Sequence, residues 1–164
     1  MGAKNLYNQP MKIIILRHGE ATYSASDRVL SLEGQRQVAA TANKLNAHYK
    51  VTTCISSNKT RALQTAKIAC NVLGFKGEVE IDKELSPSGN PAHIVSYLDT
   101  FEMGSSVVLI VSHLPLVEIL AYELNLKITL PPSFDTANAL VVDYNGKRGK
   151  YVAFYKPFED TKFF

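Results

Sequence analysis

Residues 11–20 read MKIIILRHGE, and this segment decides the class of fold that the sequence predicts. After one lysine comes a continuous run of isoleucine and leucine, which is typical of a strand buried on both faces of a parallel sheet. The run then stops on four charged or small residues, Arg17, His18, Gly19 and Glu20. Because ligands bind at the carboxyl ends of such strands, the segment predicts a sheet with a polar site at one edge.

The rest of the chain alternates between short apolar runs and segments with helical periodicity. Strands are expected at residues 51–56, 78–81 and 107–111, and a terminal hairpin is expected at 137–143 and 151–155. Helices are expected from about 114 to 124 and after three residues that can cap a first turn, Ser31, Asn58 and Asn90. Residues 17–31 are expected to form a loop. This order predicts an α/β three-layer sandwich with a mostly parallel central sheet.

Length and composition predict one domain, with residues 1–10 as a loose leader and residues 11–164 as the folded part. Of the 164 residues, 46% are hydrophobic and 20% are charged, and the formal net charge is +3. This charge is too small to predict nucleic acid or an anionic membrane as a partner. The apolar runs are too short to cross a bilayer and a secretory signal is absent, so we expect a cytoplasmic monomer. Cys54 and Cys70 are expected to be buried thiols, with a disulfide left open.

Two arginines and two histidines are predicted to meet at the carboxyl edge of the sheet. Arg17 and His18 end the first strand. Arg61 lies one turn into the helix after the second strand, and His113 follows the strand at 107–111. Clustered cations repel one another when no carboxylate is near, and a bound dianion relieves that repulsion. Because arginine matches phosphate oxygens with forked donors, the cluster indicates a phosphate site.

A histidine in such a site is also a competent nucleophile toward phosphorus. His18 can take a phosphoryl group, and water can then release it, while Arg17, Arg61 and His113 hold the other oxygens. Gly19 has no side chain, which lets the backbone approach a ligand closely. The fixed cations make a metal unnecessary, and the two histidines lack a carboxylate set with ligand spacing. We therefore expect no metal and no cofactor.

The ordered motifs resemble the histidine phosphatase superfamily, also called the phosphoglycerate mutase-like family. They are Arg17-His18-Gly19, Ser57-x-x-x-Arg61-Ala62 and Ser112-His113. The segments ELSPSG (84–89) and SHLPLV (112–117) look like those of SixA-type phosphohistidine phosphatases of bacterial phosphorelays. The resemblance extends from about residue 11 to about residue 155. It implies a minimal phosphoglycerate mutase-like fold, without the helical insertions of larger members.

The resemblance also implies roles for individual residues. It makes His18 the phosphorylated residue, in a pocket completed by Arg17, Arg61 and His113. Two weaker candidates for the pocket wall are Ser57 and the backbone amide of Leu114.

The general acid stays open between two carboxylates. In mutase-like relatives an acidic residue after the third strand protonates the leaving oxygen, and Glu84 lies in about that region. Glu20 is nearer to His18 in the sequence and could also bind substrate. An imidazole leaving group needs less acid help than an alkoxide. A weakly placed acid would therefore fit a phosphohistidine substrate better than an ester.

We therefore expect a phosphatase that acts through a phosphohistidine intermediate on His18. The expected partner is a phosphorylated histidine-containing protein, such as a phosphotransfer domain in signal transduction. One alternative has the same chemistry on a small phosphorylated substrate, either a phosphate ester or phosphoserine. A second alternative is a non-catalytic phosphate-binding module.

Overall fold

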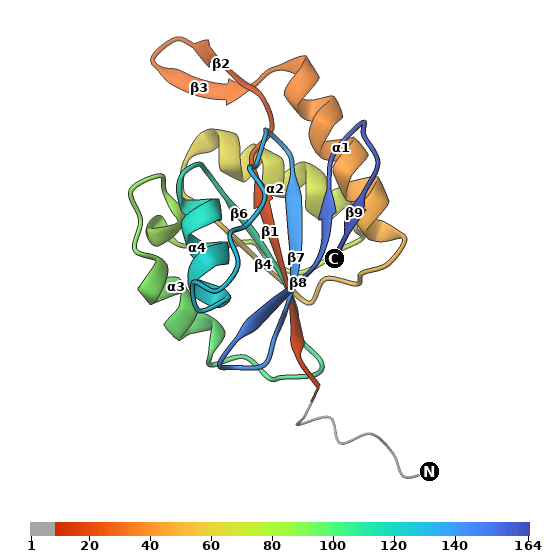
Figure 1. The fold of residues 1–164 in the computed structure, drawn as a ribbon. Coiled ribbons are helices and arrows are strands. Elements are labelled where there is room, and N and C mark those ends of the chain that lie inside the picture. Colours follow the sequence, from red (N-terminus) through yellow and green to blue (C-terminus); the bar gives the residue numbers. More distant parts are fainter. Residues whose placement is uncertain (1–8) are drawn as a thin grey trace.

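The computed structural model describes residues 9–164, in which a central sheet carries helices on both faces (Figure 1). Within these residues, seven strands pair in the order β5-β4-β6-β1-β7-β8-β9. The apolar run at the start of the chain forms β1 (Met11–Arg17), the middle strand. Its isoleucines are fully buried, as a strand with neighbours on both sides and helices on both faces requires.

Four strands run parallel and three extend the sheet in the antiparallel sense. The parallel strands are β1, β4 (Thr53–Ser56), β5 (Glu80–Ile81) and β6 (Val107–Ser112). The antiparallel part consists of β7 (Ala139–Tyr144), β8 (Gly149–Tyr155) and β9 (Lys162–Phe163). The predicted terminal hairpin is therefore confirmed as β7 and β8, whereas β9 was not expected.

The alternation of side chains along β1 divides the core into two layers. Ile14 and Leu16 pack in the cluster that contains the buried faces of α1 (Leu32–Asn46) and α2 (Thr60–Val72). Ile13 and Ile15 pack in the cluster with α3 (Pro91–Leu98) and α4 (Leu116–Leu124). The predicted three-layer α/β sandwich is thus confirmed.

The helix caps agree with the sequence at two of three places. The Ser31 hydroxyl accepts from Gly34 N at 3.0 Å, and Asn90 Oδ1 accepts from Ala92 N at 3.0 Å. The expected cap at Asn58 is wrong, because α2 has Lys59 as its N-cap residue, without a side-chain cap. Ser57 closes this turn instead, since its Oγ accepts from Lys59 N at 3.1 Å.

The expected loop at residues 17–31 is also wrong, because it contains a β-hairpin. Strands β2 (Ala21–Ser24) and β3 (Asp27–Leu30) pair with each other beyond the carboxyl end of β1 (Figure 1). The turn between them places Ala25 at a φ of 57°. This left-handed conformation normally calls for glycine or asparagine, so the sequence carries no turn signal here.

Three further expectations concern the whole chain. The predicted leader at residues 1–10 falls largely outside the described residues. Cys54 and Cys70 are both buried and unbonded to each other. No helix within residues 9–164 combines the length and the apolar character that a bilayer crossing needs.

Candidate active site

The carboxyl ends of β1, β4 and β6 meet at one edge of the sheet and bring three site residues to the same level. His18 N donates to Ser112 O at 3.0 Å, and Ser57 N donates to Val111 O at 3.0 Å. These bonds continue the parallel register beyond the strands, so that His18, Ser57 and His113 leave adjacent strands side by side. The topology therefore builds the site from residues far apart in the chain.

The two histidines of this edge face each other. The ring centroids of His18 and His113 are 4.9 Å apart, and the two side chains are almost completely buried. His18 Nδ1 lies 2.7 Å from Gly19 O. Because a carbonyl oxygen can only accept, this contact places the proton on Nδ1. The lone pair of His18 Nε2 is then available for attack.

His113 is positioned by Ser57. The distance from His113 Nε2 to Ser57 Oγ is 2.8 Å, whereas His113 Nδ1 is buried without a hydrogen-bond partner among residues 9–164. When the Ser57 hydroxyl donates to Nε2, the proton of the imidazole resides on Nδ1. The ring then presents an N–H donor at a position that an anion can satisfy.

The two arginines carry further donors without partners. Arg17 Nη1 donates to Phe134 O at 2.9 Å, which holds this side chain in place. The Nε atoms of Arg17 and Arg61 are buried, and neither has a hydrogen-bond partner in the described part of the chain. A buried donor left unpaired costs on the order of 1–3 kcal/mol. An oxyanion bound between these side chains would satisfy such donors.

Burial keeps both imidazoles neutral at pH 7. Desolvation, followed by the charges of Arg61 and Arg17, lowers the pKa of His18 to about 4. Desolvation and the charges of His18 and Arg61 lower the pKa of His113 to about 3. A neutral imidazole is the form that can act as a nucleophile.

The expectation that carboxylates are absent from this cluster is wrong. The charges of Asp135 and Glu118 act on Arg17, and the charge of Asp27 acts on Arg61. Glu118 Oε2 accepts from Phe134 N at 2.9 Å. These carboxylates offset part of the repulsion that sequence reasoning assigned to the empty site. The unpaired donors are therefore stronger evidence for an anion than net charge alone.

Gly19 has a packing role that the sequence did not predict. A Cβ at this position would lie 2.6 Å from Gly34 O and 2.8 Å from Val38 Cγ2. The missing side chain therefore allows α1 to pack against the segment after β1, and close approach to a ligand is not needed to explain it.

The two predicted acids differ in placement. Glu20 turns to α1, because its carboxylate accepts from Ser31 Oγ at 2.9 Å.

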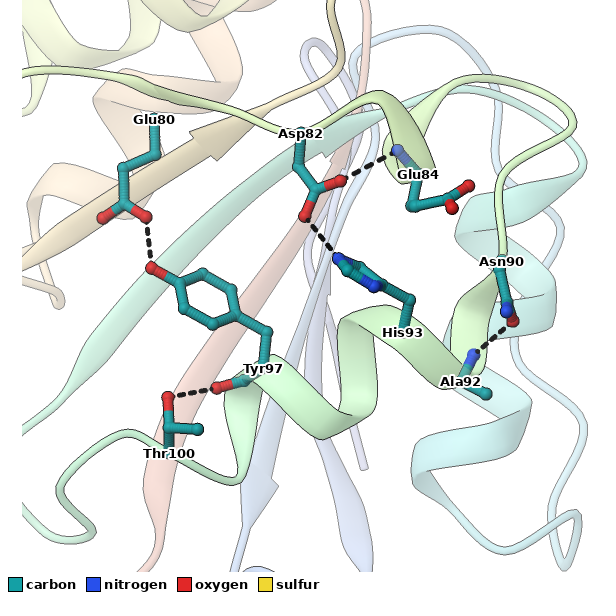
Figure 2. Close-up of polar contacts among 8 residues, drawn as sticks. All are labelled: Glu80, Asp82, Glu84, Asn90, Ala92, His93, Tyr97 and Thr100. Carbon is teal, nitrogen blue, oxygen red and sulfur yellow. Dashed lines mark hydrogen bonds and ion pairs between the residues drawn. The ribbon is translucent and has the colours of Figure 1, made fainter.

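Glu84 lies on a short 3₁₀-helix, η2 (Lys83–Leu85), that borders the pocket. Ser112 Oγ donates to Leu85 O at 2.6 Å, which attaches this turn to the residue before His113. Asp82 Oδ1 accepts from Glu84 N at 2.9 Å, and the Glu84 carboxylate extends away from Asp82 (Figure 2). Among residues 9–164 this carboxylate makes no side-chain hydrogen bond. Leu114 follows His113 at the rim, with 36% of its surface exposed.

Sequence reasoning missed two residues of the site. Arg28 on β3 adds a positive charge that acts on both imidazoles and both pocket arginines. Its segment was expected to be a loop, so nothing indicated where the side chain would lie. Phe134 contributes only its carbonyl oxygen, which no side-chain motif can reveal. Pro131 and Pro132 indicated that a loop is present there, but not its contact with Arg17.

Comparison with known proteins decides the family of the chain. The model of the histidine phosphatase superfamily (branch 1) matches residues 13–87. Phosphohistidine phosphatase SixA of Escherichia coli is 33% identical over 132 residues, which cover 77% of this chain and 81% of that protein. The chain belongs to the histidine phosphatase superfamily. The resemblance inferred from the motifs is thereby confirmed.

Two further relatives place this histidine phosphatase within the superfamily. A phosphohistidine phosphatase SixA homologue of Haemophilus influenzae is 29% identical over 154 residues, covering 85% of this chain and 92% of that protein. The structure of the protein histidine phosphatase SixA complexed with tungstate superposes with a TM-score of 0.84 at 31% identity. That similarity covers 90% of this chain and 97% of the other. The histidine phosphatase therefore has the fold of these short members over almost its full length.

Proposed function

We propose that this histidine phosphatase hydrolyses phosphohistidine on a signalling protein, through a covalent intermediate on His18. The observation that carries the proposal is the pairing of a buried, neutral His18, whose Nε2 is free, with the unpaired donors around it. The names of the relatives support the same substrate class, because two of them are called phosphohistidine phosphatases.

The first step transfers the phosphoryl group to the enzyme. His18 Nε2 attacks phosphorus, the bond from phosphorus to the substrate nitrogen breaks, and its electron pair stays on the leaving imidazole. That imidazole takes up a proton from solvent and leaves in its neutral form, while phosphorylated His18 carries the positive charge. The Nε donors of Arg17 and Arg61 and the Nδ1–H of His113 stabilise the three other oxygens as charge moves onto them.

The second step returns the enzyme to its starting state. Water attacks phosphorus, and the bond from phosphorus to His18 Nε2 breaks. Inorganic phosphate leaves, and the imidazole is again neutral with its proton on Nδ1. The hydrogen bond from Nδ1 to Gly19 O keeps the ring in the same orientation in both steps.

The placement of the acids supports phosphohistidine over an ester. Glu20 bonds to Ser31, and the Glu84 carboxylate has no hydrogen bond within residues 9–164. Hydrolysis of an ester needs a well-placed proton donor, whereas an imidazole leaving group needs less help. Glu84→Gln should therefore leave turnover of a phosphohistidine peptide nearly unchanged. Fast turnover of a sugar phosphate that depends on Glu84 would instead favour the alternative of small esters.

Quenched-flow mass spectrometry with a phosphorylated histidine-containing phosphotransfer domain tests the proposal directly. We expect a transient gain of one phosphoryl mass that maps to His18 and precedes the release of phosphate. Binding without such a gain, and without release, would favour the alternative of a non-catalytic module.

We propose a cytoplasmic monomer with one domain at residues 11–164 as the form that acts in this way.

A further inference from the structure

We propose that Arg28 binds the phosphoryl oxygens of the substrate together with Arg17 and Arg61, an inference that rests on the proposed function. Arg28 lies on β3, outside the motifs that carry the family resemblance. Arg28 would thus add a third guanidinium to the site, from a hairpin that the sequence predicts to be a loop.

Hydrogen bonds at both ends attach β3 to the first turns of α2. Asp27 Oδ2 accepts from Thr60 Oγ1 at 2.6 Å, and Gln64 Oε1 accepts from Leu30 N at 2.8 Å. Thr60 and Gln64 lie on either side of Arg61 in the helix. Arg28 is thus held on a strand that runs along the helical turn carrying a pocket arginine.

The register of the hairpin determines which way Arg28 faces. Arg28 pairs with Tyr23 on β2, and cross-strand partners project from the same face of a hairpin. The guanidinium carbon lies 5.9 Å from the centroid of the Tyr23 ring. Tyr23 is also close enough to Arg61 to influence its pKa. Leu30 lies two residues further along β3, hence on the same face as Arg28, and is buried in the cluster with α1 and α2, so Arg28 is on the face of the hairpin that turns toward these helices.

The electrostatics agree with this orientation. The charge of Arg28 lowers the pKa of both imidazoles and of both pocket arginines. Within residues 9–164, no carboxylate forms an ion pair with Arg28, although the exposed Arg36 pairs with Glu33 at 3.2 Å. A phosphoryl group would supply this half-buried residue with the counter-charge that no ion pair provides within residues 9–164.

Titration calorimetry with inorganic phosphate on the full chain tests the inference without depending on turnover. Arg28→Gln should raise the Kd for phosphate about tenfold, because one charge-assisted contact is lost. Arg28→Lys should recover part of the affinity, since it keeps the charge but loses the fork. Arg36→Gln is the matched control and should bind phosphate as the wild type does. The affinity of Arg28→Gln should also depend less on salt concentration than that of the wild type.

The possible results separate this inference from the proposed function. Equal affinity and equal salt dependence for Arg28→Gln and wild type would overturn the role of Arg28 and leave the proposed function standing. Absence of phosphate binding by the wild type would overturn both. Circular dichroism checks that Arg28→Gln is folded. If it is not, Arg28→Lys is the deciding variant. A Kd for phosphate equal to that of the wild type, with no change in salt dependence, would then contradict a bidentate contact from Arg28.

Discussion

Two polar clusters of this protein each contain a histidine, and they differ in how their hydrogen bonds are used. The pocket at the end of β1 holds His18 and His113 with three buried donors that lack partners in the described chain. The second cluster lines a cleft of about 470 Å³ between β5 and α3 (Figure 2). There, His93 Nε2 pairs with Asp82 Oδ2 at 3.2 Å, and the Tyr97 hydroxyl donates to Glu80.

The difference shows what marks a site for an anion. The cleft is roomy and polar, but its histidine and its tyrosine are each paired with a carboxylate. The pocket is buried, and three of its donors have no acceptor among residues 9–164. Buried polar groups are normally paired, so a set of unpaired donors of one kind indicates the ligand that completes them. Polarity alone does not distinguish the two places.

The largest effect is expected for His18→Asn. Asparagine can still donate to Gly19 O, but it has no lone pair on nitrogen for attack on phosphorus. Phosphate release from a phosphohistidine peptide should fall at least about 1,000-fold, as measured by single-turnover kinetics. Activity within about tenfold of the wild type would show that another residue is the nucleophile.

The next effect concerns stability and pH. In the unfolded state His18 has its ordinary pKa of 6.5, whereas burial lowers its pKa to about 4 in the folded state. Between pH 6.5 and pH 4 the unfolded state therefore binds more protons than the folded state. The protein loses stability as the pH falls through this range. The loss assigned to His18 is about 3 kcal/mol.

Urea denaturation at pH 7 and pH 4 measures this loss. His18→Asn should reduce the pH-dependent loss in the free energy of unfolding. Equal pH dependence in His18→Asn and wild type would show that His18 is not buried in its neutral form.

A smaller effect is expected for Ser57→Ala, which removes the partner of His113 Nε2. The imidazole can then change tautomer and withdraw its Nδ1–H from the bound phosphoryl group. We expect kcat to fall about tenfold. Nitrogen-15 NMR of His113 should show the proton on Nδ1 in the wild type and a different tautomer in the variant.

Ser56→Ala provides the matched control for Ser57→Ala. Ser56 is equally buried, and its Oγ donates to Ser57 O at 2.9 Å without touching the imidazole. We expect this variant to keep the tautomer of His113 and nearly all activity. The same loss of activity in both variants would point to damage of the strand end, and not to the tautomer.

The smallest effect is expected for His93→Asn in the cleft. The pair with Asp82 is exposed, so its loss should cost about 0.5 kcal/mol or less in the free energy of unfolding. Turnover of phosphohistidine should stay within about twofold of the wild type. A large loss of turnover would show that the two clusters are coupled through the Asp82 contact to the Glu84 turn.

The sequence alone predicted the layered α/β fold, the carboxyl ends of its central strands and the four residues proposed for the centre of the site. Burial on both faces of β1 is visible in the composition of residues 13–16, because a strand covered on both faces favours apolar side chains. The positions of Arg17, His18 and His113 then follow, since parallel strands end at the same edge of a sheet. Arg61 follows from its place in the first turn of α2.

The tertiary structure decided what those residues contact. Two of these contacts join segments that are distant in the chain: the Phe134 carbonyl holds Arg17, and the α1 backbone requires glycine at position 19. The hairpin that carries Arg28 depends on a turn without a glycine signal. Local patterns encode burial and periodicity, whereas contacts such as these depend on how folded elements meet. For the same reason, only the structure shows that the donors of the pocket lack partners while those of the cleft are paired.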